Sequence, residues 1–283
     1  MIFRIRHTTS YTFSKPVFLE PHILRLRPRC DAFQRLDEYD LQVDPAPAGR
    51  SDGYDAEGNN ATVVWFDGLT RHLEIHCRST VETLRPNPFD YLLTARETAN
   101  LPADYPPPDQ DALAPYRRVG GGKDLSEMVE SLLETAGGDA LAFISELNSR
   151  LYKDLDVVIR EEGDPLDPGE TLKRGEASCR DLTVLFMAVC RSVGIACRFV
   201  SGYQEGDPGQ DKRYMHAWPE VYLPGAGWRG YDPTHGLAVS DRHVSLASGA
   251  TAIAAVPTQG SFRGTEARSD MKINLAIETS LGG

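Results

Sequence analysis

The chain has 283 residues, of which 41% are hydrophobic and 25% charged, and its formal net charge is −11. This composition is typical of a soluble globular protein long enough for two domains. The acidic balance argues against nucleic acid or an anionic membrane as a main partner, because both need a basic surface. The five cysteines are too few and too scattered for a disulfide framework. No stretch resembles a signal peptide or a membrane span, so we expect a cytoplasmic protein.

Residues 1–100 are expected to form a small β-sandwich domain. Short segments rich in β-branched and aromatic residues recur there, and Asp67-Gly68 has the sequence of a tight turn. Short strands at this spacing are typical of a sandwich. The expected strands are 2–13, 22–27, 36–43, 62–66 and 73–84, with a loop over 52–60. A stretch rich in proline and glycine, 101–123, is expected to be a linker.

The second domain is expected to span residues 124–283 and to be α+β. Its apolar periodicity predicts two amphipathic helices, with Asp139 as the N-cap of the second, and a third helix that ends at Gly194. The period then changes from 3.6 to 2, which predicts strands at 195–203, 215–223 and 228–231. A polar loop over 205–213 is expected to border a cleft.

Cys179 is the first candidate for chemistry. It lies after a turn-rich segment, 163–170, and in the first turn of the largely apolar third helix. Unpaired amides at a helix start favour a thiolate over a thiol, which makes a cysteine more nucleophilic. Asp181, two residues later, is expected to bond first-turn amides or an arginine.

A nucleophilic thiol needs a base, and an imidazole base needs an acceptor that fixes its orientation. His216 begins one predicted strand and Asp232 ends the next. A five-residue loop over 223–227 would pair Tyr222 with Trp228 and put Asp232 diagonally beside His216 on the same face. We predict this register, or a bulge with the same effect.

Other histidines and cysteines allow alternative assignments. His235 is a rival base in the turn after Asp232, and His243 is a weaker one. Cys190 and Cys197 lie within an apolar helix and a strand, so we expect both to be structural. A zinc site from Cys179, His216 and Asp232 lacks the paired-ligand spacing of such sites, so neither a metal nor another cofactor is expected.

Several separated blocks occur in an order that resembles the bacterial transglutaminase-like superfamily, which has a papain-like catalytic core. They are Gly-x-x-x-Cys-Arg-Asp, Arg-Phe-Val-Ser-Gly-Tyr, His-Ala-Trp-x-Glu-Val-Tyr and Tyr-Asp-Pro-Thr, all within about 165–237. The start of the chain also resembles the β-rich N-terminal region of one bacterial branch, notably in IRHTTSYTFSKPV. The resemblance implies a nucleophile at Cys179, a base at His216 and an orienting acid at Asp232. It also implies a helix packed on an antiparallel sheet.

The resemblance and the residues together predict a cysteine-dependent enzyme that attacks the amide bond of a peptide or protein through a thioester acyl-enzyme. Hydrolysis would make it a peptidase or amidase, whereas an amine acceptor would make it a transglutaminase. A non-catalytic peptide-binding module on the same fold is the alternative of another class. Pro219 departs from a regular strand, so the His216 strand is expected to be an edge strand or to carry an irregularity. The oligomeric state and the second oxyanion-hole donor are not predicted.

Overall fold

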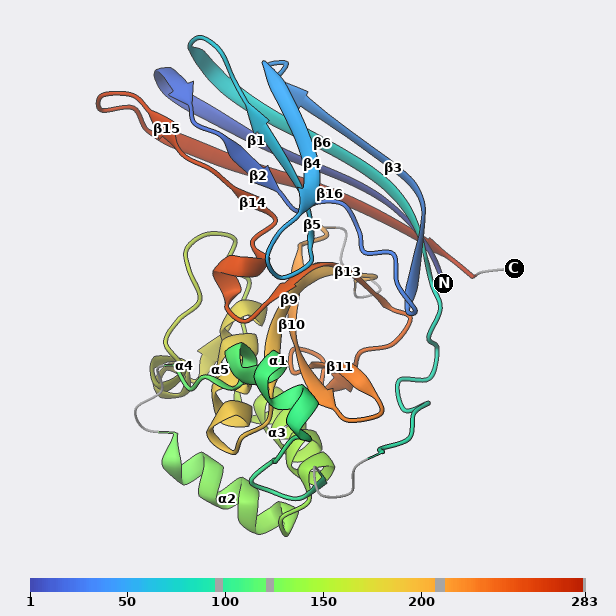
Figure 1. Ribbon diagram of the computed structural model, residues 1–283. Helices are drawn as coiled ribbons and strands as arrows, with labels where there is room; N and C mark the ends of the chain where they lie inside the picture. The colour runs from blue at the N-terminus through green and yellow to red at the C-terminus, as the bar shows by residue number, and fades with distance from the viewer. Residues whose placement is uncertain (95–98, 121–124, 207–211, 282–283) are drawn as a thin grey trace.

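The computed structural model describes residues 1–94, 99–120, 125–206 and 212–281. It has two parts, a β-sandwich and an α+β core that lies against one end of the sandwich (Figure 1). The fold class predicted from the sequence is confirmed. Among the described residues, no helix is both long enough and apolar enough to cross a membrane.

The sandwich consists of two antiparallel sheets whose inner faces share one apolar core. The first sheet has the order β15–β1–β6–β3, with β16 also paired to β1, and the second has the order β14–β2–β5–β4. Alternate residues of β1, such as Phe3 and Ile5, are buried against residues of the second sheet such as Leu24 and Val64. The strands are β1 (Ile2–Leu19), β2 (His22–Leu24), β3 (Gln34–Asp44), β4 (Gly49–Tyr54), β5 (Asn60–Trp65), β6 (Thr70–Thr83), β14 (Thr258–Gln259), β15 (Phe262–Arg263) and β16 (Ser269–Ser280).

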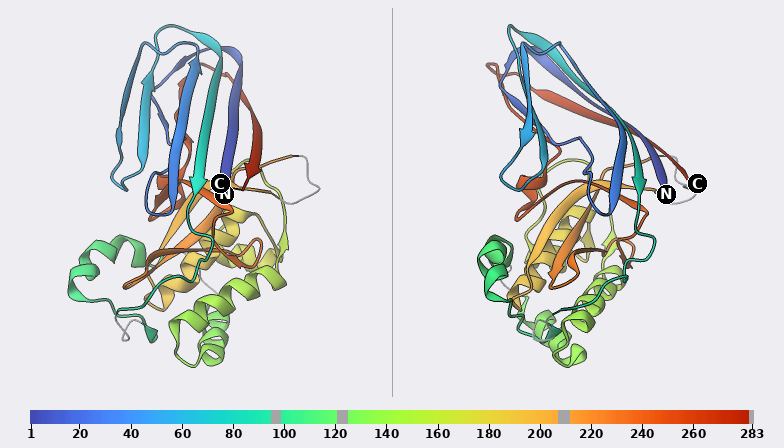
Figure 2. Two further views of the ribbon diagram at one scale, coloured as in Figure 1. Left: turned by 90° about the vertical axis from the view of Figure 1, so that its right-hand side faces the viewer. Right: turned by 45° about the vertical axis from the view of Figure 1, so that its right-hand side comes forward.

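Both ends of the chain build the sandwich, which differs from the expected division at residues 100 and 124. β16 runs antiparallel to β1 from Ile2 opposite Ser280 to Phe13 opposite Ser269. The two termini therefore lie close together, as two views show (Figures 1 and 2). Residues 258–280, assigned from the sequence to the second domain, are hydrogen-bonded to the first.

The segment expected to be a linker, 101–123, contains helix α1 (Pro107–Arg117). Prolines occupy its first turn, where no backbone N–H is needed for the helix. Tyr105 and Leu113 are buried in the apolar cluster of the core. Residues 121–123 and the expected domain start at residue 124 lie outside the described residues.

The core is a five-stranded antiparallel sheet in the order β12–β11–β10–β9–β13, with helices packed on one face. Helix α5 (Cys179–Ser192) packs against β10 and β9, and its residues Leu182, Leu185 and Phe186 are fully buried. The strands are β9 (Cys197–Gln204), β10 (His216–Leu223), β11 (Gly227–Asp232), β12 (Leu237–Ala238) and β13 (His243–Gly249). The helices are α2 (Ser126–Ala136), α3 (Ala140–Asp154), α4 (Pro168–Arg174), α5 (Cys179–Ser192) and the 3-10 turn η2 (Ala252–Ala255), and β7 (Asp156–Val157) pairs in parallel with β8 (Glu176–Ala177).

Local signals placed the helix ends correctly. Asp139 caps α3 by accepting a hydrogen bond from the backbone of Ala142, and Gly194 has the left-handed conformation (φ 83°) expected beyond α5. Strand β4 extends to Tyr54, so it includes the first residues of the loop that was expected over 52–60.

Pro219 lies in β10, a central strand, so the first alternative predicted for it, an edge strand, is wrong, whereas the second, a local irregularity, agrees with the end of β10–β11 pairing next to the proline. The direction of the backbone at Pro219 explains why a central strand can hold a proline there. Tyr222 donates its backbone N–H to Ala196 on the β9 side (3.0 Å), and Pro219, three residues earlier, therefore faces the β11 side. The β10–β11 ladder ends at Glu220 opposite Gly230, so no ladder bond is lost at the proline.

Candidate active site

Cys179 is the first residue of α5, and Asp181 holds this helix start in place. One carboxylate oxygen of Asp181 accepts from the backbone N–H (2.9 Å) and the hydroxyl (2.6 Å) of Ser178. The other accepts from the backbone of Leu166 (2.7 Å) and from the Arg160 guanidinium. The predicted roles of Asp181, to bond a helix-start amide or an arginine, are both present, and the buried carboxylate ties the preceding loop to the helix.

The hairpin of β10 and β11 has the predicted register, with Tyr222 opposite Trp228. It brings the Nε2 atom of His216 within 2.8 Å of the Oδ2 atom of Asp232. Asp232 has no exposed surface, and His216 is 9% exposed. Nε2 is thus engaged by the carboxylate, which leaves Nδ1 as the ring atom that faces the thiol.

The thiol of Cys179 and the imidazole of His216 act on each other's pKa. Burial alone would raise the pKa of Cys179, but the hydrogen bond and positive charge of His216, the Ala217 backbone N–H and the Arg180 charge lower it overall. Burial would lower the pKa of His216, but Asp232 and Cys179 together raise it to about 10. These opposite shifts favour the thiolate–imidazolium form of the pair over the form in which both groups are neutral.

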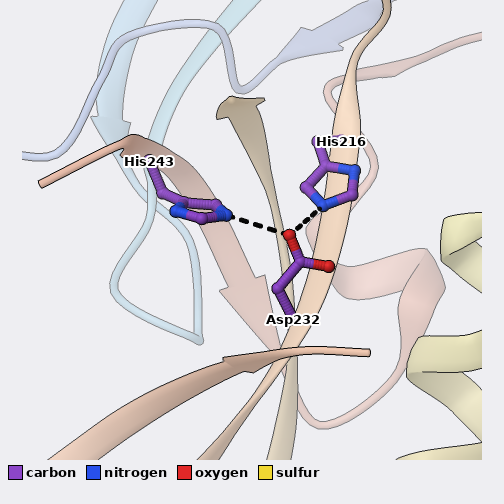
Figure 3. A group of neighbouring side chains, drawn as sticks. All are labelled: His216, Asp232 and His243. Atoms are coloured by element: carbon purple, nitrogen blue, oxygen red, sulfur yellow. Dashed lines mark hydrogen bonds and ion pairs between the residues drawn. The ribbon is translucent and has the colours of Figure 1, made fainter. Parts of the chain in front are cut away.

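Three histidines converge on Asp232. Its Oδ2 atom accepts hydrogen bonds from His216, from Nδ1 of His235 (2.8 Å) and from Nε2 of His243 (3.0 Å). Figure 3 shows the rings of His216 and His243 pointing at the same carboxylate oxygen. The other oxygen accepts from the backbone N–H of Thr234 (3.0 Å). Despite burial, which would raise it, the pKa of Asp232 lies well below its usual range because of the charge of His216 and these hydrogen bonds.

The sequence pattern suggested His235 and His243 only as rival bases, whereas in the structure both side chains donate hydrogen bonds to Asp232. Burial lowers the pKa of His243, which favours its neutral form. His243 comes from β13, two strands away from β10, and Gly202 of the intervening β9 leaves room for the approach. A side chain at Gly202 would lie 2.1 Å from the carbonyl oxygen of Val244 and 2.7 Å from the ring of Trp218.

The same cluster has the donor types of a transition-metal site. The ligand atoms of His216, Asp232 and His243 lie within 4.8 Å of one another. The zinc site that the ligand spacing in the sequence argues against has Cys179 in place of His243. Here the carboxylate oxygen itself lies where the imidazole nitrogens converge, so hydrogen bonds already account for the arrangement.

A cavity of about 1370 Å³ opens beside Cys179 and His216. Tyr11 of β1 and Met271 of β16 line it together with core residues, so the sandwich supplies part of its wall. The polar loop expected to border a cleft is described only in part, because residues 207–211 lie outside the described residues, but Lys212 and Arg213 line this cavity.

The remaining cysteines have ordinary surroundings. Cys190 and Cys197 are fully buried, as expected of structural residues, and both are free thiols. Burial and the neighbouring Cys197 raise the pKa of Cys190 well above its usual value, which disfavours its thiolate. Burial likewise raises the pKa of Cys77 to about 12, whereas the surroundings of Cys179 lower its thiol pKa.

Comparisons with known proteins agree with the fold. Residues 3–82 match the model of the bacterial transglutaminase-like N-terminal region, and residues 123–233 match that of the transglutaminase-like superfamily. An uncharacterised protein of Mycobacterium tuberculosis is 30% identical over 271 residues, which cover 87% of this chain and 83% of that relative. Another, from Mycobacterium leprae, is 25% identical over 294 residues and 97% of each chain.

A solved structure of a candidate cysteine protease from Cytophaga hutchinsonii superposes with a TM-score of 0.72 at 18% identity. The match covers 100% of this chain and 92% of that one, and at this identity it shows a shared fold. The resemblance inferred from the sequence is thus confirmed along both parts of the chain. The chain belongs to the transglutaminase-like superfamily, and it carries the bacterial N-terminal β region ahead of a transglutaminase-like core.

Proposed function

We propose that this protein is a cysteine-dependent enzyme that cleaves amide bonds of peptides or proteins. The observation that carries the proposal is the contact chain from Cys179 through His216 to Asp232 beside a large cavity. A lowered thiol pKa in a partly enclosed cleft is typical of a nucleophile rather than of a packed cysteine.

The proposed reaction has two stages. In the first, the Cys179 thiolate attacks the amide carbonyl, and the tetrahedral adduct collapses to a thioester while the C–N bond breaks. His216, protonated at Nδ1, gives this proton to the departing amine. In the second, neutral His216 accepts a proton from water as the water attacks the thioester, and the adduct collapses with cleavage of the C–S bond. This step releases the acid and restores the Cys179 thiolate beside protonated His216.

Asp232 has the role of an orienting group in this proposal. Its hydrogen bond to Nε2 fixes the ring so that Nδ1 faces the sulfur, and its negative charge stabilises the imidazolium. The remaining hydrogen bonds to Asp232 hold that carboxylate in position. The backbone N–H of Cys179 is one natural donor for the oxyanion.

The test is a screen of peptide amides with purified protein, read by mass spectrometry for products and for an acyl adduct on Cys179. Parallel reactions contain a primary amine in excess. We expect hydrolysis, loss of all turnover in Cys179→Ala, and little amine incorporation. Amine incorporation that exceeds hydrolysis would favour the transglutaminase alternative, and a Cys179 that forms no adduct and reacts like a free thiol would favour the binding module.

A further inference from the structure

An exposed aliphatic strand edge lies beside Cys179. Val157 in β7 and Ile159 just after it are 46% and 61% exposed, and both line the cavity that contains Cys179. The run Val157-Val158-Ile159 has the β-branched composition of a strand, yet its outer side is open. Single exposed aliphatic residues are common, but two of them side by side at the cavity that contains Cys179 favour a binding surface.

The backbone of this edge is also available for pairing. Asp156 and Val158 donate their N–H groups to Gly175 (2.9 Å) and Ala177 (3.0 Å), so the backbone groups of Val157, between them, face away from β8. For Ile159, the described residues provide no backbone hydrogen-bond partner. Unpaired N–H and C=O groups on a strand edge are a template for a further strand.

The edge is fixed relative to the thiol at both of its ends. At one end β7 pairs with β8, which ends at Ala177, two residues before Cys179. At the other end, the Arg180 guanidinium donates to the carbonyls of Arg160 and Gly163 (2.6 Å each). Arg160 in turn contacts Asp181 in the first turn of α5. A substrate paired with this edge would therefore meet the thiol in a constant geometry.

We propose that the Val157–Ile159 edge binds an extended segment of the substrate. The substrate backbone adds to β7 as a strand, and its apolar side chains pack on Val157 and Ile159. This inference rests on the proposed function, since the occupant is the peptide whose amide Cys179 attacks. It assigns the substrate class as an extended peptide with aliphatic residues next to the scissile bond.

The test compares the alkylation rates of Cys179 with three reagents, each normalised to its rate with glutathione. The reagents are iodoacetamide, acetyl-Ala-Leu-Ala-chloromethyl ketone, and the same ketone with its backbone amides N-methylated. We expect the unmethylated peptide reagent to react about tenfold or more faster than its methylated form, because methylation removes the donors that pair with the edge. Ile159→Ser should lower the rate with the peptide reagent several-fold and leave the rate with iodoacetamide unchanged.

The matched control is Leu69→Ser, because Leu69 is 71% exposed and does not line the cavity. It should change none of the three rates. Equal rates for the methylated and unmethylated reagents, or a peptide-reagent rate insensitive to Ile159→Ser, would overturn the strand-edge proposal while iodoacetamide still reacted fast. A slow reaction of Cys179 with iodoacetamide itself would instead refute the proposed function, and this inference with it.

Discussion

The pairing of Cys179 with His216 predicts a specific dependence of stability on pH. In the folded protein the thiol loses its proton before the imidazole does, because the pKa of Cys179 is lowered and that of His216 is raised to about 10. In the unfolded chain the two groups titrate near their ordinary values, about 6.5 for histidine and about 8.5 for cysteine. The perturbation is Cys179→Ser, which keeps the size of the residue but removes its titration.

The two groups contribute pH dependences of opposite sign. The raised pKa of His216 gives stability that is complete below about pH 6.5 and is lost as the pH rises towards about 10. The lowered pKa of Cys179 gives stability that is complete above about pH 8.5 and is lost as the pH falls. Between about pH 6.5 and 8.5 the two slopes therefore oppose each other in the wild type. In Cys179→Ser only the histidine slope remains, supported by Asp232 alone, so the free energy of unfolding should fall by at most about 1.4 kcal/mol per pH unit over this interval.

The assay is urea unfolding followed by tryptophan fluorescence at pH 6.5, 7.5 and 8.5. We compare the wild type with Cys179→Ser and with Cys30→Ser, a matched change at an exposed thiol. The free energy of unfolding of the variant at Cys179 should fall relative to both other proteins as the pH rises. Parallel pH curves for all three proteins would refute the thiolate–imidazolium pair.

Three further predictions concern the groups around this pair. Asp232→Asn removes the charge that supports the imidazolium, so the Cys179 thiol should return to an ordinary pKa. Its thiolate fraction at pH 7 would then be about 3%, and iodoacetamide alkylation of Cys179 should slow about 30-fold. The control Asp154→Asn, on the surface, should leave the alkylation rate unchanged. His243→Phe removes one buried donor to the same carboxylate and should cost about 1–3 kcal/mol in urea unfolding while slowing alkylation less than the Asp232 variant does. Asp181→Ala breaks both the helix cap and a buried ion pair and should cost about 3 kcal/mol or more, so an unchanged midpoint in thermal unfolding would contradict its role.

Much of the candidate site could be predicted from the sequence because it depends on local rules. The loop between β10 and β11 sets the register that aligns His216 with Asp232, and side-chain alternation then puts both on one face. Helix periodicity and Gly194 fix the extent of α5, and therefore the place of Cys179 at its start.

What escaped prediction depends on contacts between distant segments. The position of β13 beside β9 brings His243 to Asp232, and no local pattern around residue 243 encodes that neighbour. In the same way β16 pairs with β1 across almost the whole chain, so its place in the sandwich could not follow from its own sequence. Helix α1 was missed because its prolines, which suit a first turn, are also typical of linkers.

The most direct test of the central claim is the rate of iodoacetamide alkylation against pH, read by mass spectrometry at each cysteine in the wild type and in His216→Ala. We predict that Cys179 reacts fast well below pH 8 while the buried Cys190 and Cys197 do not. His216→Ala should move the pH profile of Cys179 towards that of an ordinary thiol. If Cys179 is alkylated no faster than those two cysteines, and if its rate is the same in His216→Ala, the proposed mechanism is contradicted.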